Sequence, residues 1–138
     1  MITKINRMKK IMPLITALLI WSLISSCSKD STSDPNNTTA PTGQWRIHYY
    51  WDEKDETSDF SGYTFEFQSG GVLKATKGAT VVNGTWSETS SKLIIDFGAD
   101  PVLNEINDDW QKTEKSDTFI KLKDDNPAQD DQLHFIKI

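Results

Sequence analysis

The strongest constraint on this chain is an alternation of apolar and polar residues with a period of two. Tyr63, Phe65 and Phe67, for example, alternate with polar neighbours, and the pattern recurs in eight short segments from residue 45 onward. Successive side chains of a β-strand point to opposite faces, so this period is typical of strands that cover a core with one face. The sequence therefore predicts an all-β domain of eight short strands.

The connections between these strands alternate in length. Short connections at 69–71, 88–91 and 115–117 contrast with long ones at 52–61, 98–107 and 124–131. In an up-and-down meander every second connection lies at the same end, so the short ones would shut one end (the closed end) and the long ones would surround the other (the mouth). A sheet closed on itself also leaves no edge for aggregation. We expect residues 43–138 to form a small eight-stranded antiparallel up-and-down β-barrel, with 101–106 as either loop or helical turn.

The inner face near the mouth is the first candidate for a binding site. Its predicted ligand-binding residues are Tyr49, Trp51, Tyr63, Phe97, Trp110 and Leu133. An eight-stranded barrel is just wide enough to be packed with side chains or to hold one small ligand. Two functions therefore stay open. One is non-enzymatic binding of a small or glycan-type ligand. The other, with a packed barrel, is a protein-interaction or accessory subunit or an enzyme inhibitor.

A Gly-x-Trp motif opens the predicted barrel and is repeated within it. Gly43-Gln44-Trp45 begins the first strand, and Gly84-Thr85-Trp86 lies in the middle of the domain. This pattern resembles lipocalins and their calycin-type relatives, and it looks like the lipocalin-like domains of Bacteroidota lipoproteins. The resemblance covers 43–138 and implies a barrel whose first tryptophan plugs the closed end. The chain is shorter than lipocalins and lacks the second cysteine that many of them use.

The N-terminal segment has the three parts of a secretory signal peptide. A basic region is followed by an apolar run from Met12 to Ile24, which is too short to cross roughly 30 Å of hydrocarbon as a permanent helix. The sequence Ile24-Ser25-Ser26-Cys27 then resembles the lipobox of bacterial lipoproteins. The resemblance implies cleavage before Cys27, diacylglycerol on its thiol, and acylation of the new N-terminus by a fatty acid such as palmitate.

These segments predict three parts for the chain. Residues 1–26 would be a cleaved lipoprotein signal peptide, 27–42 the lipidated cysteine with a flexible linker rich in Ser, Thr, Asp, Asn and Pro, and 43–138 the barrel. Two or more acyl chains anchor a protein stably. We therefore expect a lipid-anchored protein of the cell outer membrane, on its periplasmic face or the cell surface. Because the first strand would start at the closed end, the mouth should point away from the membrane.

The charge of the mature chain is strongly negative. Of 15 basic residues four lie in the signal peptide, which leaves 11 basic against 20 acidic residues and a net charge of −9. Nucleic-acid binding depends on neutralising phosphates, so this balance argues against it. In the predicted mouth loops eleven acidic residues face only two lysines, which would repel fatty acids and other anions. The expected partner is a small neutral or cationic ligand, or a protein bound at this acidic end by a monomer.

The sequence contains little that indicates catalysis. His48 and His134 fall on outward faces of predicted strands, and Cys27 is the only cysteine. A Gly-x-Ser-x-Gly motif, a phosphate-binding loop and a His-rich metal spacing are all missing from the sequence. We therefore expect no enzymatic activity, no cofactor and no metal site.

Overall fold

The computed structural model describes residues 40–138. The signal peptide, Cys27 and most of the linker predicted over 27–42 lie outside the described residues. The strands are β1 (Trp45–Asp52), β2 (Lys54–Asp55), β3 (Thr64–Gln68), β4 (Val72–Lys77), β5 (Thr80–Glu88), β6 (Lys92–Asp96), β7 (Asp108–Lys115), β8 (Phe119–Lys123) and β9 (Gln132–Lys137), and the 3-10 helices are η1 (Thr57–Phe60) and η2 (Leu103–Ile106). Within these residues no helix is long and apolar enough to cross a membrane.

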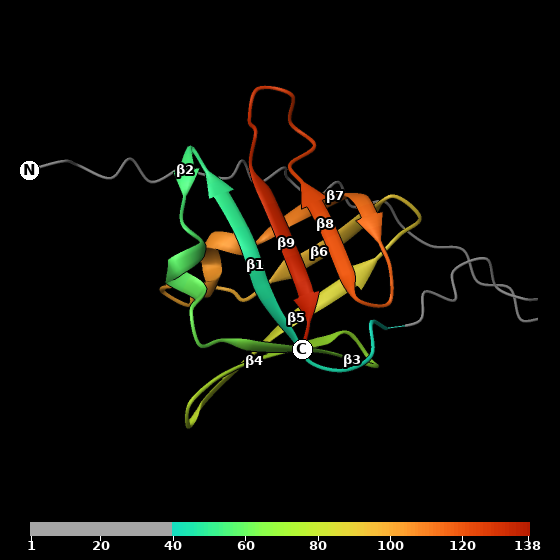
Figure 1. Cartoon of the computed structure of the whole chain (residues 1–138). Helices are drawn as coiled ribbons and strands as arrows, with labels where there is room; N and C mark the ends of the chain where they lie inside the picture. Colours follow the sequence, from blue (N-terminus) through green and yellow to red (C-terminus); the bar gives the residue numbers. More distant parts are fainter. Residues whose placement is uncertain (1–39) are drawn as a thin grey trace, which may run out of the picture. The chain divides into compact units, whose positions relative to one another are not determined.

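Eight of these strands form a closed antiparallel barrel, as predicted. From β3 onward each strand pairs with the next, β1 pairs with β3, and β9 returns to pair with β1 and close the sheet. The two-residue strand β2 pairs only with the end of β1. Figure 1 shows β1, β9 and β8 side by side, with the 124–131 connection rising above them. The strand number and meander order are consistent with a lipocalin-like fold.

The interior of the barrel is filled by apolar side chains. The buried residues are Trp45, Ile47, Tyr50, Phe60, Phe65, Phe67, Leu73, Ala75, Trp86, Leu93, Ile95, Phe97, Leu103, Ile106, Trp110, Ile120, Leu122, Leu133 and Phe135. Phe65 and Phe67 both pack edge-on against Phe135, with ring centroids 5.5 and 5.6 Å apart. Such edge-to-face pairs add to the stabilisation that comes from apolar burial alone. Side chains from β3 and β9, the two strands that flank β1, therefore meet inside the barrel.

The mouth is covered rather than merely fringed by loops. Phe60 of η1 and Leu103 and Ile106 of η2 are all buried in the core. The Tyr50 hydroxyl donates a hydrogen bond to the carbonyl of Glu105 at 2.8 Å, which ties η2 to β1. The sequence left open whether 101–106 is a loop or a helical turn. The structure has the 3-10 helix η2 over the last four of these residues, and this helix covers the mouth of the barrel.

A β-bulge in β1 changes which side chains point inward. Ile47 pairs with Phe135, but the next pair joins Tyr49 to His134, so one extra residue lies in β1 between them. A bulge shifts the alternation by one residue. Tyr50 is therefore the buried side chain, and the prediction that Tyr49 and Trp51 face the interior is wrong.

A second bulge in β7 has a similar effect. The register skips between Lys112, opposite Leu122, and Glu114. As a result Lys112 and Lys115 both lie opposite buried residues of β8, on the inner side of the sheet. They lie near the closed end, because β7 runs from the mouth to the 116–118 turn.

These two lysines form a buried ion cluster with Glu88 at the end of β5. The Lys112 ammonium lies 2.5 Å from one carboxylate oxygen of Glu88, and Lys115 lies 2.7 Å from the other. Lys112 also donates to the carbonyl of Thr89 at 2.6 Å. The Glu88 side chain is only 1% exposed. The cluster thus joins β5 to β7 across the strand between them and helps to shut the closed end.

The chain enters the barrel at this same end. The carbonyl of Gln44 accepts a hydrogen bond from the backbone of Ile138, the last residue. Gly43 lies beside the Lys137 side chain and has a φ of +93°, a backbone conformation that glycine adopts without strain. Residue 43 therefore lies at the end opposite the 124–131 connection.

Candidate binding surface

The six residues predicted to line a pocket divide into two groups. Phe97, Trp110 and Leu133 are buried in the core, and Tyr63 is half-buried against it. Tyr49 and Trp51 instead lie on the outer side of β1, opposite His134 and Gln132. The structure therefore does not bring all six residues to one internal site, and two of them belong to a surface outside the barrel.

Five side chains form what we call the outer aromatic surface. They are His48, Tyr49, Trp51, Phe119 and His134. Ring centroids of Tyr49 and His134 are 5.1 Å apart, and Phe119 lies 5.9 Å from His134 and 6.3 Å from His48. Three strands contribute to it, because β1, β9 and β8 are neighbours. Aromatic rings thus gather on a face that a solvated sheet would ordinarily cover with polar residues.

The two bulges lie at opposite ends of one row across the outer face. Tyr49 pairs with His134, His134 pairs with Lys121, and Lys121 pairs with Glu114. The bulge in β1 begins this row, and the bulge in β7, at Thr113, ends it. Bulges commonly occur where a strand must re-aim side chains toward a functional site. The row is therefore a candidate site on the basis of backbone geometry as well as composition.

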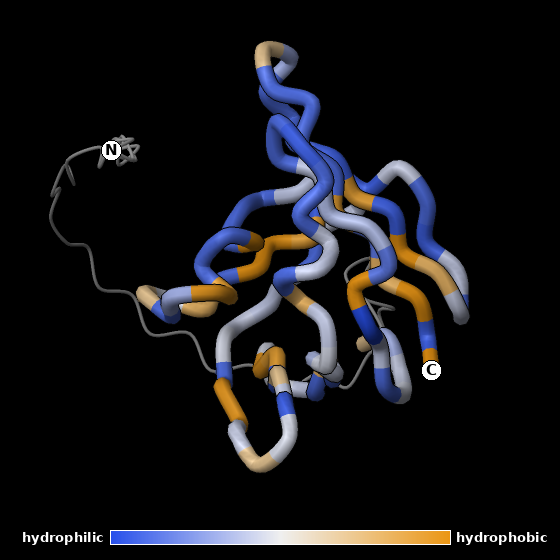
Figure 2. The backbone as a smooth tube through the Cα atoms, turned by 60° about the vertical axis from the view of Figure 1, so that its left-hand side comes forward, coloured by the Kyte–Doolittle hydropathy of each residue, from blue (hydrophilic) through white to orange (hydrophobic). Residues whose placement is uncertain are grey.

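A groove of about 670 Å³ continues this row beneath the last long connection. Its floor includes Thr113, Lys121, Lys123 and His134, and its wall is the 124–131 connection, which we call the overhanging loop. Figure 2 shows that this loop is hydrophilic except near its tip. Ligand sites are commonly concave and of this size.

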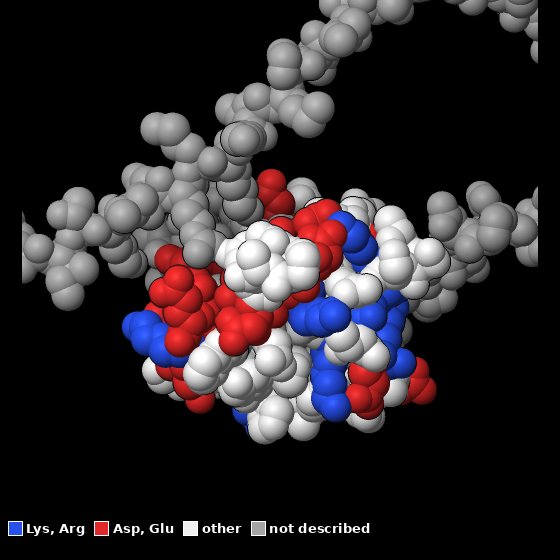
Figure 3. All heavy atoms as spheres, turned by 90° about the horizontal axis from the view of Figure 1, so that it is seen from above, with Lys and Arg blue, Asp and Glu red and all other residues white. Residues whose placement is uncertain are grey.

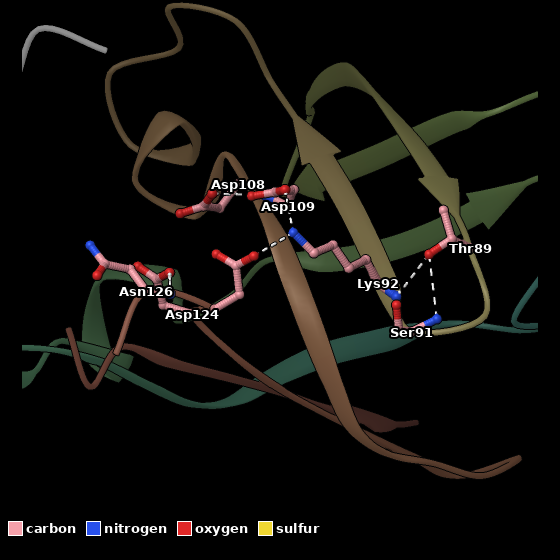
Figure 4. Close-up of polar contacts among 8 residues, drawn as sticks. Thr89, Ser91, Lys92, Asp108, Asp109, Asp124 and Asn126 are labelled. Carbon is pink, nitrogen blue, oxygen red and sulfur yellow. Dashed lines mark hydrogen bonds and ion pairs between the residues drawn. The ribbon is translucent and has the colours of Figure 1, made fainter. Parts of the chain in front are cut away.

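The overhanging loop is held in place from a different part of the barrel. Lys92 in β6 makes ion pairs with Asp109 of β7, at 2.7 Å, and with Asp125 of the loop. Figure 4 shows the Lys92 side chain between Asp109 and the acidic residues of the loop. Hydrogen bonds to these two carboxylates raise the pKa of the Lys92 ammonium. Lys92 therefore stays charged and fixes the position of the groove's wall.

Charges of the two signs lie on different sides of this end of the barrel. Figure 3 shows acidic atoms gathered toward β2 and around the overhanging loop, while basic atoms gather on the other side. The charged residues that line the groove are Lys121, Lys123, Asp124, Asp125, Asp130 and Asp131. Four aspartates and two lysines give the groove a net negative charge.

The histidine at the centre of the row should report on pH. Burial lowers the pKa of His134 from its ordinary value of 6.5, helped by Lys121 and His48. The unfolded chain therefore takes up this proton first as the pH falls, so stability should decline below about pH 6.5 until the folded pKa is passed. In melting curves between pH 8 and pH 5, His134→Gln should remove this part of the decline. An identical pH dependence in both proteins would contradict the assignment.

Comparison with known proteins gives no family for this chain. No family model, curated protein or solved structure matches this chain. Within residues 40–138 no group of three or more His, Cys, Asp or Glu side chains is placed to hold a metal ion. The functional argument therefore depends on the geometry and chemistry of the outer face.

Proposed function

We propose that this protein is a lipid-anchored lipoprotein of the cell envelope that binds a neutral glycan on its outer face, without catalysing a reaction. The observation that carries the proposal is the position of the aromatic side chains. The interior is packed, whereas Tyr49, Trp51 and Phe119 remain only half-buried on the outer aromatic surface. Partly exposed aromatic groups gathered in one place are typical of a binding surface.

The mixture of groups on this face favours a glycan over a protein partner. The centre of a protein interface is usually a desolvated apolar cluster with a polar rim. Here the centre of the row consists of the polar side chains of His134 and Lys121. The aromatic rings of Tyr49 and Trp51 lie to one side of this centre, on β1. A sugar presents C–H faces to aromatic rings and hydroxyl groups to polar side chains, so it matches this alternation. The groove under the overhanging loop also has the concave form of a ligand site.

The charge of the groove restricts the class of glycan. Its aspartates outnumber its lysines, and the mature chain carries a net charge of −9. An anionic sugar would be repelled as it approached. Neutral hydroxyl groups, by contrast, accept and donate hydrogen bonds with carboxylates and ammonium groups alike. We therefore expect an uncharged glycan, in line with the ligand class that the sequence favours.

The proposed anchor is compatible with access to this face. A linker from lipidated Cys27 would join the barrel at Gly43, at the closed end. Two acyl chains would hold the protein at the membrane. The overhanging loop lies at the other end, so the groove would face away from the lipid surface.

Binding to a panel of neutral glycans tests the proposal. Isothermal titration with cellohexaose, laminarihexaose, maltohexaose, xylohexaose and mannohexaose should identify at least one that binds. Tyr49→Ala and Trp51→Ala should each weaken that binding by about tenfold, because each removes one ring face.

Tyr63→Ala provides the matched control. Tyr63 is another half-buried tyrosine, but it packs against Phe65 with Lys77 over its ring, away from the outer aromatic surface. Its substitution should leave glycan affinity unchanged. Equal losses from Tyr63→Ala and Tyr49→Ala would contradict a site on the outer face, and binding to a protein surface in place of every glycan would favour the protein-interaction alternative.

A further inference from the structure

The outer aromatic surface and the groove are continuous with each other. Tyr49, His134 and Lys121 are direct neighbours across three strands, and the groove extends the same row to Thr113 in β7. Adjacent strands lie about 4.8 Å apart, so the row is about 14 Å long. The distance is much greater than the width of one sugar ring.

A second row runs beside the first. Trp51 pairs with Gln132, and Gln132 pairs with Lys123, two residues along the strands from the row just described. Two residues of a strand span about 7 Å, so the two rows together form a band that is longer across the strands than along them. The long direction of the site is therefore perpendicular to the strands.

The chemistry changes along this long direction. At the β1 end the rings of Tyr49 and Trp51 offer flat faces for stacking. At the other end, Lys121 and Lys123 of β8, Thr113 of β7 and the polar overhanging loop offer hydrogen bonds and a wall on one side. A single sugar ring could contact only one of these ends, so binding to both requires a chain.

We infer that the site takes a stretch of about three linked rings from a linear neutral polysaccharide, laid across the strands from Tyr49 to the groove under the overhanging loop. This inference rests on the proposed function and adds the length and direction of the ligand. It explains why the aromatic rings and the groove occupy neighbouring strands instead of forming one compact pocket.

A length series tests the inference. Titrations would use the disaccharide, trisaccharide, tetrasaccharide and hexasaccharide of whichever glycan in the panel binds. Affinity should rise by about tenfold or more between the disaccharide and the tetrasaccharide, and then stay level. Tyr49→Ala at one end and Lys123→Met at the other should each weaken hexasaccharide binding. The double variant should bind the hexasaccharide no better than the wild type binds the disaccharide.

Each negative result of these titrations would contradict a different claim. A disaccharide that binds as tightly as the hexasaccharide would overturn the inferred length while leaving glycan binding on this face intact. An unchanged hexasaccharide affinity in Lys123→Met, with a loss in Tyr49→Ala, would overturn the inferred path into the groove. Failure of all five hexasaccharides to bind would contradict the proposed function, and with it this inference.

Discussion

Replacing Trp110 by alanine is expected to lower the free energy of unfolding by about 4 kcal/mol. The Trp110 side chain is 2% exposed, and its indole N–H donates a hydrogen bond to the carbonyl of Ile106 at 3.0 Å. The substitution would leave a cavity below η2 and would remove a bond that holds η2 over the mouth. Urea denaturation followed by circular dichroism measures the loss.

A second substitution separates packing from hydrogen bonding at this position. Trp110→Phe keeps most of the apolar contact but removes the donor, so we expect a smaller loss of about 2 kcal/mol. Both variants, while folded, should bind the glycan as the wild type does, because Trp110 lies inside the barrel. An alanine variant with unchanged stability and no glycan binding would instead place the ligand in the interior.

Replacing Glu88 by leucine is expected to lower the free energy of unfolding by about 3 kcal/mol. The carboxylate is buried between Lys112 and Lys115, and removing it would leave two ammonium groups close together with no counter-charge from Glu88. The closed end should loosen as a result. The same urea titration measures the effect.

An exposed ion pair provides the control for this experiment. Glu114 pairs with Lys121 at 2.7 Å, but both side chains are largely open to solvent, at 51% and 41% exposed. Glu114→Leu should therefore change stability by less than about 1 kcal/mol. Adding Lys112→Met to Glu88→Leu should recover part of the loss, because it removes one of the unpaired charges. Similar small effects of Glu88→Leu and Glu114→Leu would show that the buried cluster does not stabilise the closed end.

The strands and their order could be predicted because the pattern that encodes them is local. Each strand alternates within its own few residues. Tyr63, just before β3, and Phe65 and Phe67 within it show this pattern, and the two phenylalanines are buried in the core. In a meander, the lengths of the connections then determine which end of the barrel is closed and which end is the mouth. The closed barrel follows from these two patterns, and the structure confirms it.

The position of the proposed binding surface could not be predicted, because a bulge leaves no gap in the sequence. The run Tyr49-Tyr50-Trp51 is aromatic throughout. The sequence is therefore equally compatible with Tyr50 pointing inward and with Tyr49 and Trp51 pointing inward. The extra residue at His48 is visible only in the pairing with β9. Two consecutive tyrosines in a strand were the one available signal that both faces of β1 are aromatic.

The ion pairs that reshape the acidic end were also invisible in the sequence. Counting charges by loop assigns Asp125 to an unopposed acidic rim. In the structure Lys92, 33 residues earlier in the chain, neutralises it and holds the overhanging loop in place. The barrel brings β6 near this loop, and no local pattern records that approach. The same holds for Lys112 and Lys115, which a period-two pattern alone does not place together on the inner side.

The central claim is that the ligand binds outside the barrel, and tryptophan indole signals test it most directly. The described chain has Trp51 on the outer face, whereas Trp45, Trp86 and Trp110 are buried. In a nitrogen–proton NMR titration with the bound hexasaccharide, the indole signal of Trp51 should shift progressively while the other three stay in place. Shifts of Trp110 and Trp86 with an unmoved Trp51 would contradict the account and place the ligand inside the barrel.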